Sequence, residues 1–226
     1  MTDGGEVSRL FQIPPLPLLL SFKFLHLGSG SSGLPCSDTY RGTAPASEPE
    51  VQGIKAQIEA IGGENIVLYM DVHSYSQLWL VPWSGTTTKP ADYDQMVQNL
   101  NLSNSLDLLL LFFLLQMGGG NAAAAAILAA EGRTFRVGTP PDLLCELQSF
   151  GLLKMFLFNN NPDVADGGSF DWAKYDAGVK YGYAPELRPA STAEGGFAPP
   201  ASHILPSGRE TFAGTVANID YAAANP

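Results

Sequence analysis

The chain of 226 residues is 45% hydrophobic, which is enough to bury one sizeable core, and its length favours a single domain. Its 12 basic and 22 acidic residues give a net charge of -10, which argues against nucleic acid and anionic membrane surfaces as partners because both attract basic patches. The leucine-rich run at residues 108–115 is far shorter than the ~20 residues that span a bilayer as a helix, so no membrane partner is expected.

Residues 1–34 combine a proline-leucine segment with a glycine-serine segment, and neither has a hydrophobic period. We therefore expect a poorly structured N-terminal segment, followed by one domain over residues 35–226. Asp3 and Glu6 stand where a signal peptide has basic residues, so no clear signal peptide is present.

Cys36 and Cys145 could form a disulfide in a secreted protein or remain two thiols, and the sequence does not decide between these states.

The first predicted element of the domain is an amphipathic helix over residues 47–61. Ser47 and Glu50 have the spacing of a capping box, and Gly62 and Gly63 are expected to end the helix. One face of this helix carries the apolar residues, and we expect it to be buried; this stripe consists of Val51, Ile54, Ile58 and Ile61.

A buried strand is predicted at residues 66–70, where branched and aromatic side chains follow one another without a polar residue. His73 comes just after this strand, and open α/β sheets place their ligands at the carboxyl ends of strands. A second strand is expected to start after His73, within the stretch 71–83. A single histidine is not a ligand set, so local hydrogen bonding is the alternative to metal binding for His73.

The middle of the chain is predicted to contain a helix that starts at Pro90, an alanine-rich helix over residues 121–130 and a short strand at 134–138. Two apolar segments interrupt this pattern, at about residues 99–116 and 145–162. Exposed runs of this kind favour aggregation. They are consistent with surface insertions or with intron sequence retained in the translation.

The last third is predicted to contain a helix over residues 171–177 and a strand over 180–187. Pro185 cannot donate a ladder hydrogen bond, which favours an edge position or a bulge. A second capping box, Ser207 with Glu210, predicts a terminal helix. Its buried stripe is expected to be Phe212, Val216 and Ile219.

Four short blocks of sequence occur in an order that is typical of one peptidase family. They are PCSDTYRG at residues 35–42, DVHSYSQLWL at 71–80, GGSFDW at 167–172 followed by GVKY and ELR, and PASHILP at 200–206. Together they resemble the zinc carboxypeptidases of the carboxypeptidase A/B type. The resemblance covers about residues 30–98, 117–144 and 163–221, and it corresponds to the C-terminal half or so of such a catalytic domain.

This resemblance implies an α/β fold, with a mixed sheet flanked by helices in an incomplete carboxypeptidase-like domain. It also implies zinc as cofactor, the C-termini of peptides or proteins as substrates, and an extracellular location. His73 matches the family's third zinc ligand, and Glu186 matches the general base that activates the zinc-bound water. Four residues match positions that contact the substrate: Tyr75, Leu80, Phe170 and Ala184. The apolar Phe170 implies a preference for apolar or aromatic C-terminal residues.

The zinc site is incomplete in this chain. The family's other two ligands come from a His-x-x-Glu motif, and none of His26, His73 and His203 is followed by glutamate at that spacing. The Asn-Arg pair that binds the substrate's terminal carboxylate in the family is also absent. The alternative to a metallocarboxypeptidase is therefore a non-catalytic remnant or peptide-binding module. The alternative to a catalytic role for Glu186 is that it is a surface residue of the strand and pairs with Arg188.

Overall fold

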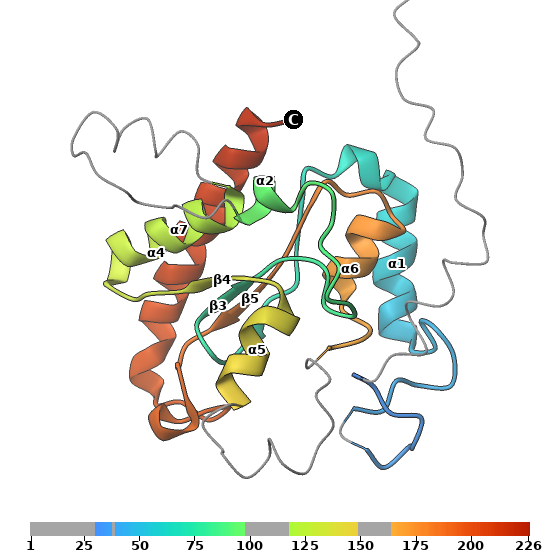
Figure 1. Ribbon diagram of the computed structural model, residues 1–226, viewed down its shortest axis with the longest axis horizontal. Coiled ribbons are helices and arrows are strands. Elements are labelled where there is room, and N and C mark those ends of the chain that lie inside the picture. Colours follow the sequence, from blue (N-terminus) through green and yellow to red (C-terminus); the bar gives the residue numbers. More distant parts are fainter. Residues whose placement is uncertain (1–29, 38, 98–117, 149–163) are drawn as a thin grey trace, which may run out of the picture.

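The computed structural model describes residues 30–37, 39–97, 118–148 and 164–226, without the side chains of residues 145–148. A mixed sheet lies between two groups of helices (Figure 1), which confirms the predicted fold class. Residues 1–29 and most of the two predicted insertions lie outside this description, so the proposed domain boundaries stay predictions. No helix in the described residues is long and apolar enough to cross a membrane.

The sheet contains five strands in the described residues, namely β1 (Leu68–Met70), β2 (His73–Ser74), β3 (Leu78–Leu80), β4 (Arg136–Gly138) and β5 (Tyr181–Leu187). The order is β1-β5-β3-β4, and β2 also pairs with β5. Strands β1 and β2 run parallel to β5, whereas β3 runs antiparallel to β5 and parallel to β4.

Strand β5 lies inside the sheet, so the edge position that Pro185 suggested is wrong. The proline is accommodated by a break in the neighbouring strand. Met70 of β1 pairs with Tyr183 and His73 of β2 pairs with Glu186, so Pro185 faces the gap between β1 and β2, where no ladder hydrogen bond is required from it.

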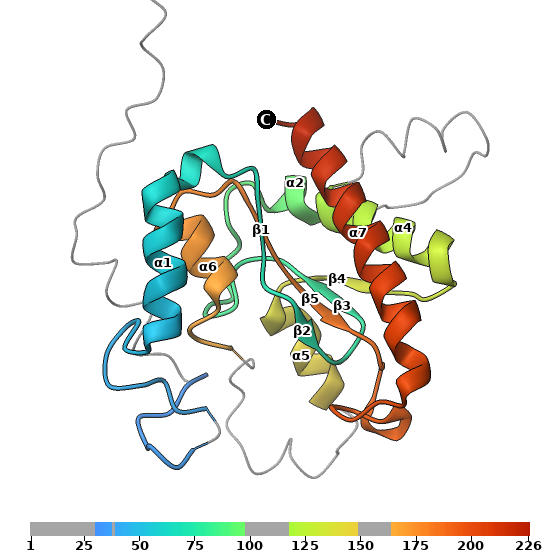
Figure 2. The ribbon, with the colours of Figure 1, turned by 180° about the vertical axis from the view of Figure 1, so that it is seen from behind.

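The helices are α1 (Pro49–Ile61), α2 (Tyr93–Val97), α4 (Gly119–Glu131), α5 (Pro140–Gln148), α6 (Ser169–Tyr175) and α7 (Ile204–Ala224). Short 3-10 turns occur at Gly63–Asn65, Thr192–Glu194 and Ala201–His203. Helices α1 and α6 lie on one side of the sheet, and α4 and α7 lie on the other (Figure 2). Helix α5 includes residues 145–148, which are the first residues of the second predicted insertion, and the bounds of that insertion stay a prediction.

Alternating side chains of β3 separate two cores. Trp79 and Val81 belong to the larger cluster, which includes residues of α2, α4, β5 and α7. Leu78 and Leu80 belong to a smaller cluster with Leu143, Phe170 and Ala184. The period of two along a strand therefore directs neighbouring residues to opposite faces of the sheet. Strand β1 is only partly buried, so the predicted complete burial of residues 66–70 is wrong.

Helix α1 ends at Gly62 as predicted, but its start and its buried face differ from the prediction. The N-cap is Glu48, with no capping side chain, and the Ser47 hydroxyl bonds to the Glu48 carboxylate at 2.8 Å. Pro49 suits the first turn because a proline needs no partner for an N–H there. Only Ile58 is buried. A cavity of about 650 Å³, lined by Val51, Ile54, Tyr69 and Trp172, lies beside α1, so most of the predicted stripe is exposed.

Helix α7 also turns an unpredicted face to the sheet. Its buried residues are Glu210, Gly214, Asn218 and Ala222, while the predicted stripe of Phe212, Val216 and Ile219 is exposed. The reason is close approach: a Cβ atom at Gly214 would lie 2.8 Å from the Trp79 ring. The predicted capping box is wrong as well, because Ser207 lies within the helix and Glu210 binds Arg188.

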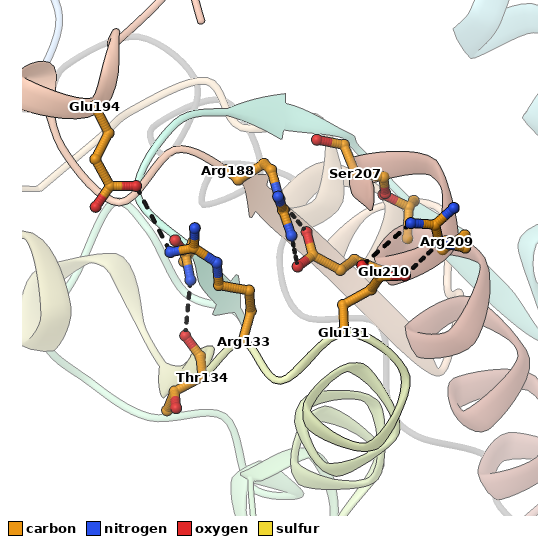
Figure 3. A network of polar contacts seen from close by, with 10 residues as sticks. Glu131, Arg133, Thr134, Arg188, Glu194, Ser207, Arg209 and Glu210 are labelled. Carbon is orange, nitrogen blue, oxygen red and sulfur yellow. Dashed lines mark hydrogen bonds and ion pairs between the residues drawn. The ribbon is translucent and has the colours of Figure 1, made fainter. Parts of the chain in front are cut away.

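A buried ion pair joins the end of β5 to α7. The Nε of Arg188 donates to Oε2 of Glu210 at 2.8 Å, and Nη2 of Arg188 donates to Oε1. Figure 3 shows the two side chains facing each other, with the Arg209–Glu131 and Arg133–Glu194 pairs nearby. Since Arg188 is bound to Glu210, the alternative in which it forms a surface pair with Glu186 is wrong.

Candidate metal and catalytic site

The sheet brings His73 and Glu186 together. They are register partners on the parallel strands β2 and β5, although 113 positions separate them in the sequence. Residues paired in this way project to the same face of a sheet. The structure therefore places the predicted metal ligand beside the predicted general base, while the roles themselves stay predictions.

Glu186 has the environment of a perturbed carboxyl group. Its Oε2 atom is buried and has no hydrogen-bond partner among the described residues. Burial raises the pKa of Glu186 above its ordinary value, and the nearby His73 opposes this effect only in part. A carboxyl group with a raised pKa and an unused oxygen is suited to take up a proton, which is what a general base does.

His73 is held by a carboxylate that the sequence analysis did not identify. Its Nε2 lies 3.0 Å from Oδ1 of Asp71, and this hydrogen bond raises the pKa of His73 above its ordinary value. Burial alone would raise the pKa of Asp71, but hydrogen bonds from His73 and Ser169 outweigh it and lower that pKa. Histidines that bind metals commonly donate their second nitrogen to a carboxylate in this way.

The described residues fit a zinc site only in part. Asp71 accepts from Nε2 of His73, so the neutral ring keeps its lone pair on Nδ1, where a metal could bind. A catalytic zinc takes three protein ligands. Within residues 30–37, 39–97, 118–148 and 164–226, no group of 3 or more His, Cys, Asp or Glu side chains could hold a metal ion.

The predicted substrate-binding residues fall into two places. Leu80, Phe170 and Ala184 are buried together in the smaller cluster. Tyr75 lies elsewhere, with its ring edge-on to that of Phe197 at a centroid distance of 4.8 Å. His203 lies at the end of a 3-10 turn before α7. Cys36 is exposed and free, so it forms no bridge to Cys145.

Comparison with known proteins identifies the family of this chain. The model of the zinc carboxypeptidase family matches residues 18–214. Carboxypeptidase B of Astacus astacus is 35% identical over 192 residues, which are 84% of this chain and 50% of that protein. Carboxypeptidase A2 of Rattus norvegicus is 33% identical over 199 residues, covering 88% of this chain and 37% of that protein. The chain thus spans half or less of the length of these relatives.

Solved structures give the same result for the fold. Bovine thrombin-activatable fibrinolysis inhibitor, solved in complex with tick carboxypeptidase inhibitor, aligns with a TM-score of 0.67 at 25% identity. That alignment covers 88% of this chain and 53% of the bovine chain. Carboxypeptidase A of Helicoverpa armigera aligns with a TM-score of 0.61 over 91% of this chain and 42% of that one. With the family model matching most of its length and the sheet placing His73 beside Glu186, the chain belongs to the zinc carboxypeptidase family.

Proposed function

We propose that this chain provides one side of the active site of a metallocarboxypeptidase, which removes C-terminal residues from peptides or proteins. The observation that supports this most strongly is the buried Glu186 carboxyl group, with an unused oxygen, in register with His73. In this proposal the remaining zinc ligands come from the part of the catalytic domain that this chain does not contain, since the chain spans half or less of the length of its relatives. An extracellular location is part of the same proposal and is supported by the family resemblance alone.

The roles of the two residues follow from their surroundings. Zinc in this family lowers the pKa of a bound water and polarises the scissile carbonyl. His73 offers Nδ1 as a ligand, because its Nε2 is occupied by Asp71. Glu186 accepts the proton of the attacking water on the oxygen that has no other partner among the described residues. The raised pKa of Glu186 makes it a stronger base than a carboxylate in open solvent.

The specificity proposed for the site follows from Phe170, Leu80 and Ala184. All three are apolar and pack in one cluster, so they offer no charge to a basic side chain. Burying Lys or Arg without a partner costs several kcal/mol, whereas an apolar side chain gains ~25 cal/mol per Å² that it buries. We therefore infer a preference for apolar or aromatic C-terminal residues. In this proposal Tyr75, which lies outside the cluster, also contacts the substrate.

A completed domain tests this function. In it, the chain is preceded by the part of the Astacus astacus relative that its match does not cover. The completed domain is expected to release C-terminal Leu or Phe at least ~10-fold faster than Lys or Arg, as measured by kcat/KM on matched peptides. Faster release of the basic residues would contradict the assignment of Phe170, and no release from any peptide would favour the non-catalytic alternative.

Zinc binding by the chain alone is a separate prediction. At the candidate site the described residues supply one imidazole, that of His73, rather than three ligands. The chain is therefore expected to retain well under one zinc per molecule after dialysis. Elemental analysis of the dialysed protein measures this, and the completed domain is the matched control that should retain zinc. Stoichiometric zinc in the isolated chain, retained against a mild chelator, would show that it already contains a full ligand set.

A further inference from the structure

We propose that Ser169 and Tyr69 are positioning residues for the candidate site. They act through Asp71, which they hold in the orientation that keeps the proton of His73 on Nε2 and its lone pair on Nδ1. The inference deepens the proposed function and rests on it, since it concerns the presentation of His73 to a metal. Nothing in the sequence motifs connects these residues, because Ser169 lies about one hundred positions from Tyr69 and Asp71.

The contacts form one continuous chain of donors and acceptors. The Tyr69 hydroxyl donates to Oγ of Ser169 at 2.9 Å, and the Ser169 hydroxyl donates to Oδ2 of Asp71. The other oxygen of that carboxylate, Oδ1, lies 3.0 Å from Nε2 of His73. With a neutral His73, the Tyr69 and Ser169 hydroxyls each donate once along this chain, and the backbone N–H of Ser169 also donates to the Asp71 carboxylate. A carboxylate only accepts, so the direction of each hydrogen bond is fixed.

The contacts of Asp71 with His73 and with Ser169 have different effects on the carboxylate. A carboxylate that bonds only to the imidazole can rotate about its Cβ–Cγ bond and carry the ring with it. The bond from the Ser169 hydroxyl to the second oxygen, together with the bond from the Ser169 backbone N–H, restricts that rotation. This restraint is needed because the side chain of His73 is 51% exposed, so the surrounding core does not fix the ring.

The Ser169 hydroxyl is not used elsewhere. Ser169 is the first residue of α6, where serine side chains often serve as helix caps, but the N-cap here is Gly168 and no side chain caps the helix. Gly167, with φ of 86°, adopts a conformation that favours glycine and leads the chain into this turn. The Gly-Gly-Ser turn thus delivers a hydroxyl group to Asp71, and Tyr69 on β1 orients it.

The imidazole ¹⁵N chemical shifts of His73 provide the test, because they report which ring nitrogen carries the proton. The protein is labelled with ¹⁵N-histidine and studied without zinc or substrate, at one pH where the ring is neutral. Asp71→Ala defines the shifts of an unheld ring, and His73→Gln assigns the signals. Ser169→Ala is expected to move the His73 shifts towards the Asp71→Ala values, although the backbone N–H of residue 169 remains as a donor to Asp71. Ser169→Thr keeps the hydroxyl and is expected to stay near wild type.

His203 serves as the internal control, because it lies in a different part of the fold. A shift at His73 alone supports the proposal, and unchanged His73 shifts in Ser169→Ala overturn it. If Ser169→Ala moves the signals of His73 and His203 together, the Tyr69→Phe variant is measured as the second test. A shift confined to His73, smaller than that in Ser169→Ala, supports the proposal, and unchanged His73 signals overturn it. Since zinc and activity are not measured, a failure here leaves the proposed function standing, and an inactive completed domain leaves this result standing.

Discussion

Replacement of Glu210 by alanine is expected to lower the free energy of unfolding by about 3–5 kcal/mol, because it leaves a buried guanidinium without its partner. The side chains of Arg188 and Glu210 are 7% and 1% exposed, and two hydrogen bonds join them (Figure 3). Arg188 follows the last residue of β5 and Glu210 lies in α7, so the pair ties the strand that carries Glu186 to the terminal helix. Urea unfolding monitored by circular dichroism measures the loss.

The matched control is Glu131→Ala, which removes the partner of Arg209. Because the Arg209 side chain is 58% exposed and solvent screens this pair, the loss is expected to be much smaller than that of Glu210→Ala. A double variant, Arg188→Met with Glu210→Leu, removes both charges and is expected to be more stable than Glu210→Ala alone. Equal losses in Glu210→Ala and Glu131→Ala would contradict the assignment of a desolvated pair.

Helices α1 and α7 show which structural features sequence patterns can predict. Sequence patterns located α1 and α7 only approximately, because both predicted capping boxes were wrong, and of the two predicted buried stripes only Ile58 of α1 is buried. The amphipathic rule assumes that apolar residues meet the core. In α7 the deciding factor is the approach of the helix to Trp79, which only Gly214 permits, together with a buried arginine that requires Glu210. Both causes lie on other elements, so no pattern within the helix could reveal them.

The candidate site was predictable to a different extent. The motifs named His73 and Glu186, and the pairing of β2 with β5 brings them side by side. Asp71 was missed, although an aspartate two residues before a histidine is a visible signal, because its contact depends on the break between β1 and β2. Ser169 lies in the GGSFDW block and Tyr69 in the predicted strand 66–70, but no motif connects either residue with Asp71. Their roles arise where α6 meets β1, and a single sequence does not show which elements meet.

Replacement of Glu186 by glutamine in the completed domain is expected to lower kcat/KM by ~10²–10⁴-fold, the usual contribution of a general base. Glutamine keeps the shape of the side chain but cannot accept the proton, so the loss is expected in kcat rather than in KM. Steady-state hydrolysis of a peptide that ends in Leu or Phe measures the effect. Glu194→Gln is the matched control, because Glu194 is exposed and pairs with Arg133.

The same assignment of Glu186 as the base predicts the direction in which activity changes with pH. Glu186 acts as a base only when ionised, and burial raises its pKa above the ordinary value of 4.5. The activity of the completed domain is therefore expected to rise with pH through that raised pKa, and this acid limb should be absent from the residual activity of Glu186→Gln. A variant that kept wild-type kcat/KM and the same acid limb would show that another group accepts the proton. In that case the register pairing with His73 would be structural rather than catalytic.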